Sequence, residues 1–282
     1  MAGQRTAGKP IFRFGVVADP QYAPVAPSGT RYYSNTLWKL SEAIKVFNGE
    51  DLEFIVTLGD TIDRHWRSYG HLLPLYKTLE HPNFFILGNH DFYVARHYLN
   101  SVLQTLGLRR AYYDFAGRGH RFIVIDGNEI SLFANAEGTE NHAAAKKRIS
   151  DMQAAGAYNA HDVNGGISDL QFAWVQQVMN KAKAAGERVI VMSHYPIYPV
   201  NDLNLLDDAR LVDLLTSYDN FLLYINGHNH AGNFGAIGRK YFVNFKGMVE
   251  TPDTTAFSVI EIYDHRINIR AFGAEEPRTL SL

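Results

Sequence analysis

The side chains that could do chemistry in this sequence lie in five short segments, and each segment directly follows an apolar run typical of a buried strand. They are carboxylates, carboxamides and imidazoles: Asp19, Gln21, Asp60, Asp63, Asn89, His90, Asp91, His194, His228 and His230. Oxygen and imidazole ligands suit divalent manganese, iron, cobalt or zinc, and the chain has no cysteine that could supply a thiolate. The residue types therefore indicate a site for divalent metal ions.

The spacing of the segments supports one shared site. The carboxyl ends of strands in an α/β sheet meet at one edge, where ligands bind, so segments scattered from residue 19 to residue 230 can converge. Glycines at positions 59, 88 and 227 are expected to let the backbone turn sharply before a ligand. One such segment alone is a weak signal, because an Asp or His at a strand end is often a cap or a hydrogen-bonded core residue. Five in order are a strong signal.

The elements that must position these residues alternate along the chain, which is typical of an α/β fold. Apolar runs predict strands at 11–18, 53–58, 83–87, 111–115, 121–126, 188–193 and 221–226. Apolar side chains spaced three and four apart predict a helix from near Ser34, and Ser168-Asp-Leu-Gln171 is typical of a capping box that opens another. Four runs between residues 232 and 272 predict an antiparallel edge near the C-terminus.

The chain of 282 residues is interpreted as a single domain over residues 1–282, with a polar, flexible tail at 1–10. Residues 127–166 are rich in Ala, Asn, Gly and His, and only 143–155 could be helical. An excursion of this length inside a compact domain is usually functional or disordered, so we expect an insert or lid.

Composition excludes several classes of protein. The net charge of −2 leaves no strong basic field for nucleic acid or an anionic membrane surface. The first apolar run, 11–18, is too short for a signal peptide, and no run approaches the 18 or so residues of a membrane span. We expect a soluble, cytoplasmic protein with a small-molecule partner, and the oligomeric state stays open.

Asp-x-Gln, Gly-Asp-x-x-Asp, Gly-Asn-His-Asp, a single His after a strand and Gly-His-Asn-His together resemble the signature of calcineurin-like metallophosphoesterases, from residue 11 to about 245. The resemblance implies a four-layer α/β/β/α sandwich with mixed sheets and two metal ions at the strand ends. By the family pattern, the first ion would be held by Asp19, Gln21, Asp60 and His230. The second would be held by Asp60 (as a bridge), Asn89, His194 and His228.

Gln21 stands where most such proteins have His, and this departure is similar to the manganese-dependent ADP-ribose/CDP-alcohol diphosphatase branch. Softer matches to that branch are 30–33, 165–168 with Gln171 and Trp174, and the Gly-Met-Val-Glu run at 247–250. The resemblance implies cleavage of a phosphoanhydride bond in a nucleotide diphosphate derivative, with manganese favoured and iron, cobalt or zinc as alternatives.

General chemistry agrees with the resemblance. Two metal ions about 3.5–4 Å apart lower the pKa of a shared water and hold the bridging hydroxide in line with phosphorus. Two divalent ions also outweigh the charges of Asp19 and Asp60, so the centre would attract an anionic phosphate or diphosphate.

Three further residues carry expected roles. The family pattern makes His90 a hydrogen-bond or proton donor to the reacting phosphate, beside the ligand Asn89, and Asp63 the carboxylate that fixes its imidazole. A helix N-cap is the alternative for Asp63. Arg31 could clamp a second phosphate, although a plain surface arginine is almost as good an interpretation.

Two other functions compete. A cyclic-nucleotide or glycerophosphodiester phosphodiesterase would more typically carry His at position 21. A metal-binding scaffold on the same fold would typically lose ligands or the catalytic His, whereas all these positions are filled here.

Overall fold

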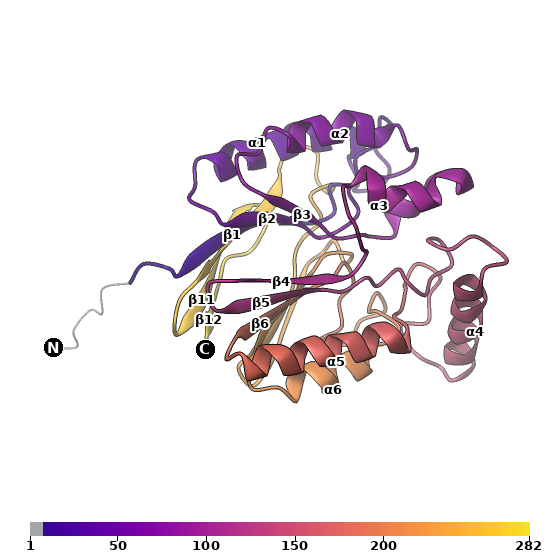
Figure 1. Ribbon diagram of the computed structural model, residues 1–282. Coiled ribbons are helices and arrows are strands. Elements are labelled where there is room, and N and C mark those ends of the chain that lie inside the picture. Colours follow the sequence, from indigo (N-terminus) through magenta and orange to yellow (C-terminus); the bar gives the residue numbers. More distant parts are fainter. Residues whose placement is uncertain (1–7) are drawn as a thin grey trace.

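The computed structural model describes residues 8–282, so residues 1–7 of the expected tail lie outside the described part of the chain. Two six-stranded sheets face each other, and helices cover the outer face of each (Figure 1). This arrangement confirms the expected four-layer α/β/β/α sandwich. Within the described residues, no helix is both long and apolar enough to cross a bilayer.

The first sheet has the strand order β12-β11-β10-β1-β2-β3. Its strands are β1 (Phe12–Val17), β2 (Phe54–Thr57), β3 (Asn83–Phe85), β10 (Ala256–Ile262), β11 (Arg266–Gly273) and β12 (Arg278–Ser281). The first three run parallel, and β10, β11 and β12 add antiparallel pairs. Helices α1 (Thr36–Asn48) and α2 (Ser68–Tyr76) cover its outer face (Figure 1).

The second sheet has the order β4-β5-β6-β7-β9-β8. Its strands are β4 (Tyr113–Gly117), β5 (His120–Val124), β6 (Arg188–Met192), β7 (Phe221–Asn226), β8 (Asn233–Ile237) and β9 (Lys240–Asn244). The pairs β5-β6, β6-β7 and β7-β9 are parallel. Helices α5 (Asp169–Ala184) and α6 (Asp208–Thr216) cover the outer face (Figure 1).

Apolar side chains fill all three interlayer spaces. Phe14, Phe122 and Ile190 belong to the cluster between the sheets, to which both sheets contribute buried residues. A second cluster joins α1 and α2 to the first sheet, and a third joins α5 and α6 to the second. Since strands covered on both faces must be apolar throughout, this packing explains the continuous apolar runs in the sequence.

The expected helices are present, with differences at their ends. The first begins at Thr36 after a short 3₁₀ turn, Tyr33–Asn35. Ser168 caps α5 by accepting from the Gln171 N–H at 3.1 Å, but the reciprocal half of a capping box is absent. The Gln171 side chain instead bonds the backbone N–H and C=O of Asp126, because it is buried against the end of β5.

The C-terminal strands make the expected antiparallel pairs, but they are divided between the sheets. β8 and β9 form a hairpin at the edge of the second sheet, and β10, β11 and β12 extend the first. The strand β12 was not expected from the sequence, because its four residues, Arg-Thr-Leu-Ser, contain no apolar run.

Residues 127–166 contain one helix, α4 (Glu140–Ala154), which lies at the end of the sandwich opposite the C-terminus (Figure 1). The helix agrees with the expected helical piece at 143–155. The segment is fastened to the body by an ion pair between Arg148 and Asp207 at 2.9 Å and by a bond from Asn159 Nδ2 to the Leu205 carbonyl at 2.8 Å. The remaining short helices are α3 (Val102–Thr105) and the 3₁₀ helices His90–Phe92 and Arg96–Ser101.

Candidate metal centre

Loops at the carboxyl ends of five strands bring the expected ligands together. Those after β1, β2 and β3 belong to the first sheet, and those after β6 and β7 to the second. They contribute buried side chains: Asp19, Gln21, Asp60, Asn89, His194 and His228, with His230 partly exposed. The convergence of the five segments is therefore a fact of the structure, while the ligand assignment itself stays a prediction.

The backbone around these residues is strained. Asp19, Gln21, Asp60 and His228 all have φ between 44° and 67°, a left-handed conformation that non-glycine residues rarely adopt. Such strain persists only where the surrounding structure enforces it, and it is common at functional sites.

The glycines beside the ligands act differently from the expectation. Only Gly59 has a positive φ, of 90°, and makes the sharp turn. Gly88 and Gly227 are required for close approach, because a Cβ at either position would collide with the carboxylate of Asp60 or Asp19.

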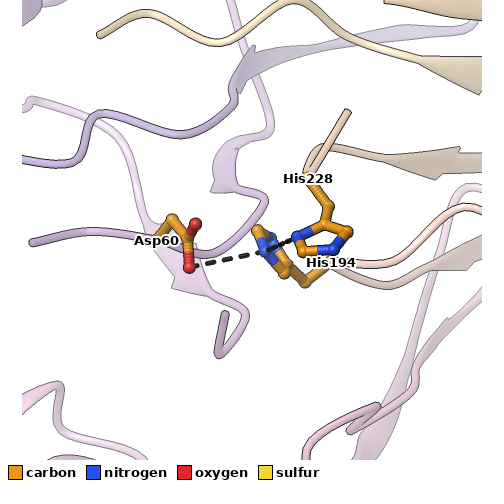
Figure 2. Close-up of side chains that lie close together, drawn as sticks. All are labelled: Asp60, His194 and His228. Carbon is orange, nitrogen blue, oxygen red and sulfur yellow. Dashed lines mark hydrogen bonds and ion pairs between the residues drawn. The ribbon is translucent and has the colours of Figure 1, made fainter. Parts of the chain in front are cut away.

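One group of possible ligands consists of Asp60, His194 and His228 (Figure 2). The Nε2 atom of His194 lies 3.4 Å from Asp60 Oδ1 and 3.1 Å from His228 Nδ1. It also lies 3.1 Å from the amide oxygen of Asn89. Four atoms that could coordinate a metal ion, two nitrogens and two oxygens, therefore face one small volume.

The outer nitrogens of both imidazoles are committed to acceptors. His194 Nδ1 lies 2.8 Å from the Leu58 carbonyl. His228 Nε2 lies 3.2 Å from Asn164 Oδ1, and the Asn164 amide group is fixed in that direction because its Nδ2 donates to the carbonyls of Asn159 and Asp202. Both outer nitrogens must carry hydrogen, so the inner nitrogens present lone pairs to each other. The repulsion between these two lone pairs is removed only when a proton or another cation lies between the nitrogens. The arrangement therefore fits a metal ion.

The second group consists of Asp19, Asp60 and His230. His230 Nε2 lies 3.6 Å from Asp19 Oδ1, and its Nδ1 lies 2.7 Å from Glu250 Oε1. Asp60 belongs to both groups, which is the place that a bridging ligand would take.

Gln21 lies in this second group with its amide nitrogen inward. Nε2 is 2.8 Å from Asp60 Oδ2 and 3.1 Å from His230 Nε2, whereas Oε1 is buried without a hydrogen-bond partner. Coordination by Gln21 needs a half-turn of its amide group, which would bring the unpaired oxygen to the ligand position.

The electrostatics of the centre favour positive charge. Burial lowers the pKa of His194, but the carboxylates of Asp60 and Asp19 outweigh burial and raise the pKa to about 9. Burial likewise lowers the pKa of His230, and Asp19 and Glu250 raise it to about 9.

The pKa values of two other side chains of the centre, His228 and Asp60, are lowered instead of raised. Burial and the neighbouring His194 hold the pKa of His228 well below its usual range. Burial raises the pKa of Asp60, yet the adjacent imidazoles of His194 and His90 bring it well below normal. The centre therefore holds an ionised carboxylate beside protonated imidazoles. A divalent ion can replace those protons and bind to the carboxylate and the imidazoles together.

His90 lies beside both groups without belonging to either. Its Nδ1 is 2.9 Å from Asp63 Oδ1, and its Nε2 is 4.0 Å from Asp60 Oδ2. The contact with Asp63 is the expected one. The alternative of a helix N-cap is wrong, since α2 begins at Ser68 with Arg67 in the cap position.

Arg31 lies at the rim of the centre. Its Nε is 3.8 Å from Glu250 Oε1, and its side chain is 36% exposed. This places a guanidinium next to the carboxylate that supports His230, while contact with a phosphate stays a prediction.

Three supporting residues were not assigned a role from the sequence: Asn164, Glu250 and Asp91. Asp91 is buried and accepts from the Gly88 and Thr61 N–H groups, so it fixes the loops after β3 and β2 to each other. Burial raises its pKa to about 6. Glu250 lies in the 247–250 run that the sequence singles out, but only the fold brings it to His230.

A buried lysine holds the Glu250 loop. Lys39 of α1 donates to the backbone carbonyls of Met248, Thr251 and Glu250, and burial lowers its pKa to about 8. No ligand-like spacing marks Lys39 in the sequence, because its partners lie more than 200 residues away.

Comparison with known proteins agrees with the arrangement. A family model described as calcineurin-like phosphoesterase matches residues 12–232. The chain is 28% identical over 301 residues to a manganese-dependent ADP-ribose/CDP-alcohol diphosphatase of Arabidopsis thaliana, covering 93% of this chain and 94% of the relative. A Homo sapiens protein of the same name is 27% identical over 321 residues, covering 96% and 93%. A dimetal phosphatase structure from Danio rerio superposes with a TM-score of 0.86 at 24% identity, over 97% of this chain and 99% of that one, which shows a shared fold.

Proposed function

The chain belongs to the calcineurin-like phosphoesterase family, and on that premise we propose that it is a manganese-dependent diphosphatase. Its substrate would be a nucleoside diphosphate derivative of the ADP-ribose or CDP-alcohol type, cleaved at the phosphoanhydride bond. Family membership makes the protein a metal-dependent hydrolase. Relatives with this diphosphatase name, matched over more than nine-tenths of both chains, support the finer assignment.

One observation carries the proposal at the site itself. The second group of possible ligands offers two carboxylates and one imidazole, and Gln21 adds a carboxamide with an unpaired buried oxygen. A set with three oxygen donors and one nitrogen suits a harder ion such as manganese better than one with a second imidazole would.

Two ions fit the residues present. Asp19, Gln21 and His230 would hold the first and Asn89, His194 and His228 the second, with Asp60 shared. When bound, the ions supply positive charge to the phosphates and an acidified water as nucleophile.

The chain's own residues would do the rest. Asp63 accepts from His90 Nδ1, which leaves Nε2 free to face the reacting phosphate beside Asp60. His90 donates a hydrogen bond or a proton to an oxygen of that phosphate, where negative charge develops. Asn89 presents its side chain to the same place, and Arg31 would neutralise the second phosphate. A single domain and a cytoplasmic location also stay predictions.

The test is a metal analysis followed by a substrate panel with added manganese. We expect two divalent ions per chain and turnover of ADP-ribose or a CDP-alcohol in preference to cyclic nucleotides and glycerophosphodiesters. Asp60→Asn is the inactive control, because losing the shared carboxylate should weaken both ions.

Two other results of this substrate panel would favour the alternative functions. Preference for a cyclic nucleotide or a glycerophosphodiester would move the protein to the phosphodiesterase alternative. Bound metal without turnover of any member of the panel would favour a metal-binding scaffold.

A further inference from the structure

Two cavities of different chemistry flank the candidate metal centre. The first, here the His230 cavity, has a volume of about 420 Å³ and is lined by His230, Glu250, Thr30, Lys246 and small residues. The second, here the Trp66 cavity, has about 600 Å³ and is lined by Arg64, His65, Trp66, Arg67, Tyr93, Ala95 and Tyr98. Both volumes are in the range of small-ligand sites.

The Trp66 cavity begins next to His90. The ring of Tyr93, which forms part of its wall, lies 4.5 Å from the imidazole of His90. Arg64 Nε lies 3.5 Å from Asp63 Oδ2, and the other oxygen of Asp63 holds His90. A substrate with its reacting phosphate at the metal centre can therefore extend past His90 into this cavity.

The lining of the Trp66 cavity is cationic, and none of the described residues that line it is acidic. Arg64 and Arg67 are both exposed, and within the described part of the chain Arg67 has no ion-pair partner. Because the whole chain carries a net charge of −2, this positive charge is local rather than general. A guanidinium matches the geometry of a phosphate group.

Aromatic rings distinguish the two cavities. Trp66 stacks on Tyr98 with centroids 4.6 Å apart and an interplanar angle of 10°, and Tyr93 adds a third ring that is 37% exposed. No phenylalanine, tyrosine or tryptophan is among the described residues that line the His230 cavity. A nucleobase gains binding free energy from aromatic surfaces and arginine, whereas a sugar or short alcohol does not need them.

We propose that the Trp66 cavity binds the nucleoside monophosphate half of the substrate. The base lies against the aromatic wall, and its phosphate lies near Arg64 and the metal centre. The base-free half extends the other way, toward the His230 cavity and Lys246. This assignment rests on the proposed function and fixes the direction in which the substrate lies across the centre.

The two products of a phosphoanhydride cleavage test the direction without turnover. The probes are AMP, which carries the base, and ribose 5-phosphate, which does not, and each is titrated calorimetrically into the manganese-loaded protein. Arg67→Ala and Tyr98→Leu should each weaken AMP binding about tenfold, the effect of losing one charge-assisted contact or one stacking surface. The same variants should change ribose 5-phosphate binding less than twofold.

Two further variants complete the design. Lys246→Ala should weaken ribose 5-phosphate and leave AMP within twofold. Arg96→Ala is the matched control, since Arg96 is an exposed arginine of the neighbouring segment whose side chain donates to the Glu137 carbonyl, and it should change neither. Arg64 is left intact because it contacts the partner of His90.

The assignment is overturned if AMP binds equally well to wild type, Arg67→Ala and Tyr98→Leu, or if Lys246→Ala weakens AMP instead. Hydrolysis of P1,P2-dimethyl diphosphate separates this result from the proposed function, because that compound has the anhydride but no base. A wild type that cleaves none of dimethyl diphosphate, ADP-ribose and a CDP-alcohol refutes the diphosphatase proposal, whatever the AMP titrations show.

Discussion

At the scale of the residue, each imidazole of the centre has one ring nitrogen hydrogen-bonded to a supporting acceptor, and its other ring nitrogen faces the site. Leu58 O, Asn164 Oδ1 and Glu250 Oε1 accept from His194, His228 and His230 respectively. Support of this kind fixes both the tautomer and the direction of the ring, and it raises the basicity of the free nitrogen. His90 follows the same rule through Asp63, although we expect its free nitrogen to serve the substrate instead of a metal ion.

Replacement of His90 by Ala separates donor from ligand. We expect the metal content to stay unchanged while kcat falls by about 10²–10⁴, the usual loss for a positioned proton donor. Metal analysis beside steady-state kinetics gives the answer. A stoichiometric loss of one ion would mean that His90 is a ligand.

Gln21→His tests the oxygen-rich ligand set. An imidazole is a softer and more basic donor than a carboxamide, so the variant should bind zinc or cobalt more tightly at that site and depend less on added manganese. Activity against metal concentration is the measurement, for wild type and variant. Identical metal profiles would show that Gln21 does not coordinate.

At the scale of the element, the segment 127–166 contributes a supporting residue to the centre. Asn164 reaches His228 from this segment, and Asn159 and Arg148 fasten the segment to the body. Its start is fixed too, since Asn128 donates to the Leu87 carbonyl after β3 at 2.8 Å. A displacement of this segment therefore changes the support of a candidate ligand.

Asn164→Ala should weaken binding of one metal ion by about 10- to 100-fold, the usual effect of losing a ligand's supporting partner. Asn159→Ala is the control, because it removes a buried hydrogen bond of the same segment without touching His228. Calorimetric metal titration compares the two. Equal losses of metal affinity in both variants would show that Asn164 only holds the loop in place and does not support His228 specifically.

Asp126, at the end of β5, makes the stability of this region depend on pH. Burial raises its pKa from 3.8 to about 6, so between these values the native chain binds more protons than the unfolded chain. Its contribution to the free energy of unfolding therefore falls as the pH rises from about 4 to about 6, by up to about 3 kcal/mol.

Asp126→Asn removes this titration. The free energy of unfolding of the variant, relative to wild type, should rise between pH 4 and pH 6 and then level off. Urea unfolding at a series of pH values measures the difference. A difference that does not vary with pH would show that Asp126 keeps an ordinary pKa.

At the scale of the whole molecule, the candidate ligands come from both sheets. Asp19, Asp60 and Asn89 follow strands of the first sheet, and His194 and His228 follow strands of the second. Without a cation, this end of the interface gathers carboxylates and partly protonated imidazoles in a buried place. An ion bound to these candidate ligands would tie the two sheets together there, so we expect metal binding to be linked to the stability of the entire sandwich.

Manganese should therefore raise the melting temperature. An ion at 1,000 times its dissociation constant adds about 4 kcal/mol to the free energy of unfolding. For a chain of this length that corresponds to an increase of about 7 °C. Calorimetric scans with manganese and with a chelator measure it, and Asp60→Asn should show a much smaller increase. An equal increase in the variant would place the stabilising ion elsewhere.

The four layers were expected from the family resemblance. The sequence by itself determined the alternation of strands and helices, the strand-end location of the centre and the residues that meet there. Those features depend on local pattern: strands covered on both faces are continuously apolar, and carboxyl ends of parallel strands share an edge. Helix α1 is recoverable for the same reason, since its buried residues Leu40, Ile44 and Phe47 keep helical spacing.

Only the tertiary structure decided which residues support the ligands and where the later strands go. Asn164, Glu250 and Lys39 make their contacts across 64, 20 and 209 residues, so no local spacing reports them. The division of β8 and β9 from β10, β11 and β12 between two sheets has the same cause, because hairpins look alike whichever sheet edge they extend. Gly88 and Gly227 show the limit most clearly: the sequence predicts a turn from a glycine, whereas the fold needs the missing Cβ so that a carboxylate can lie against the backbone.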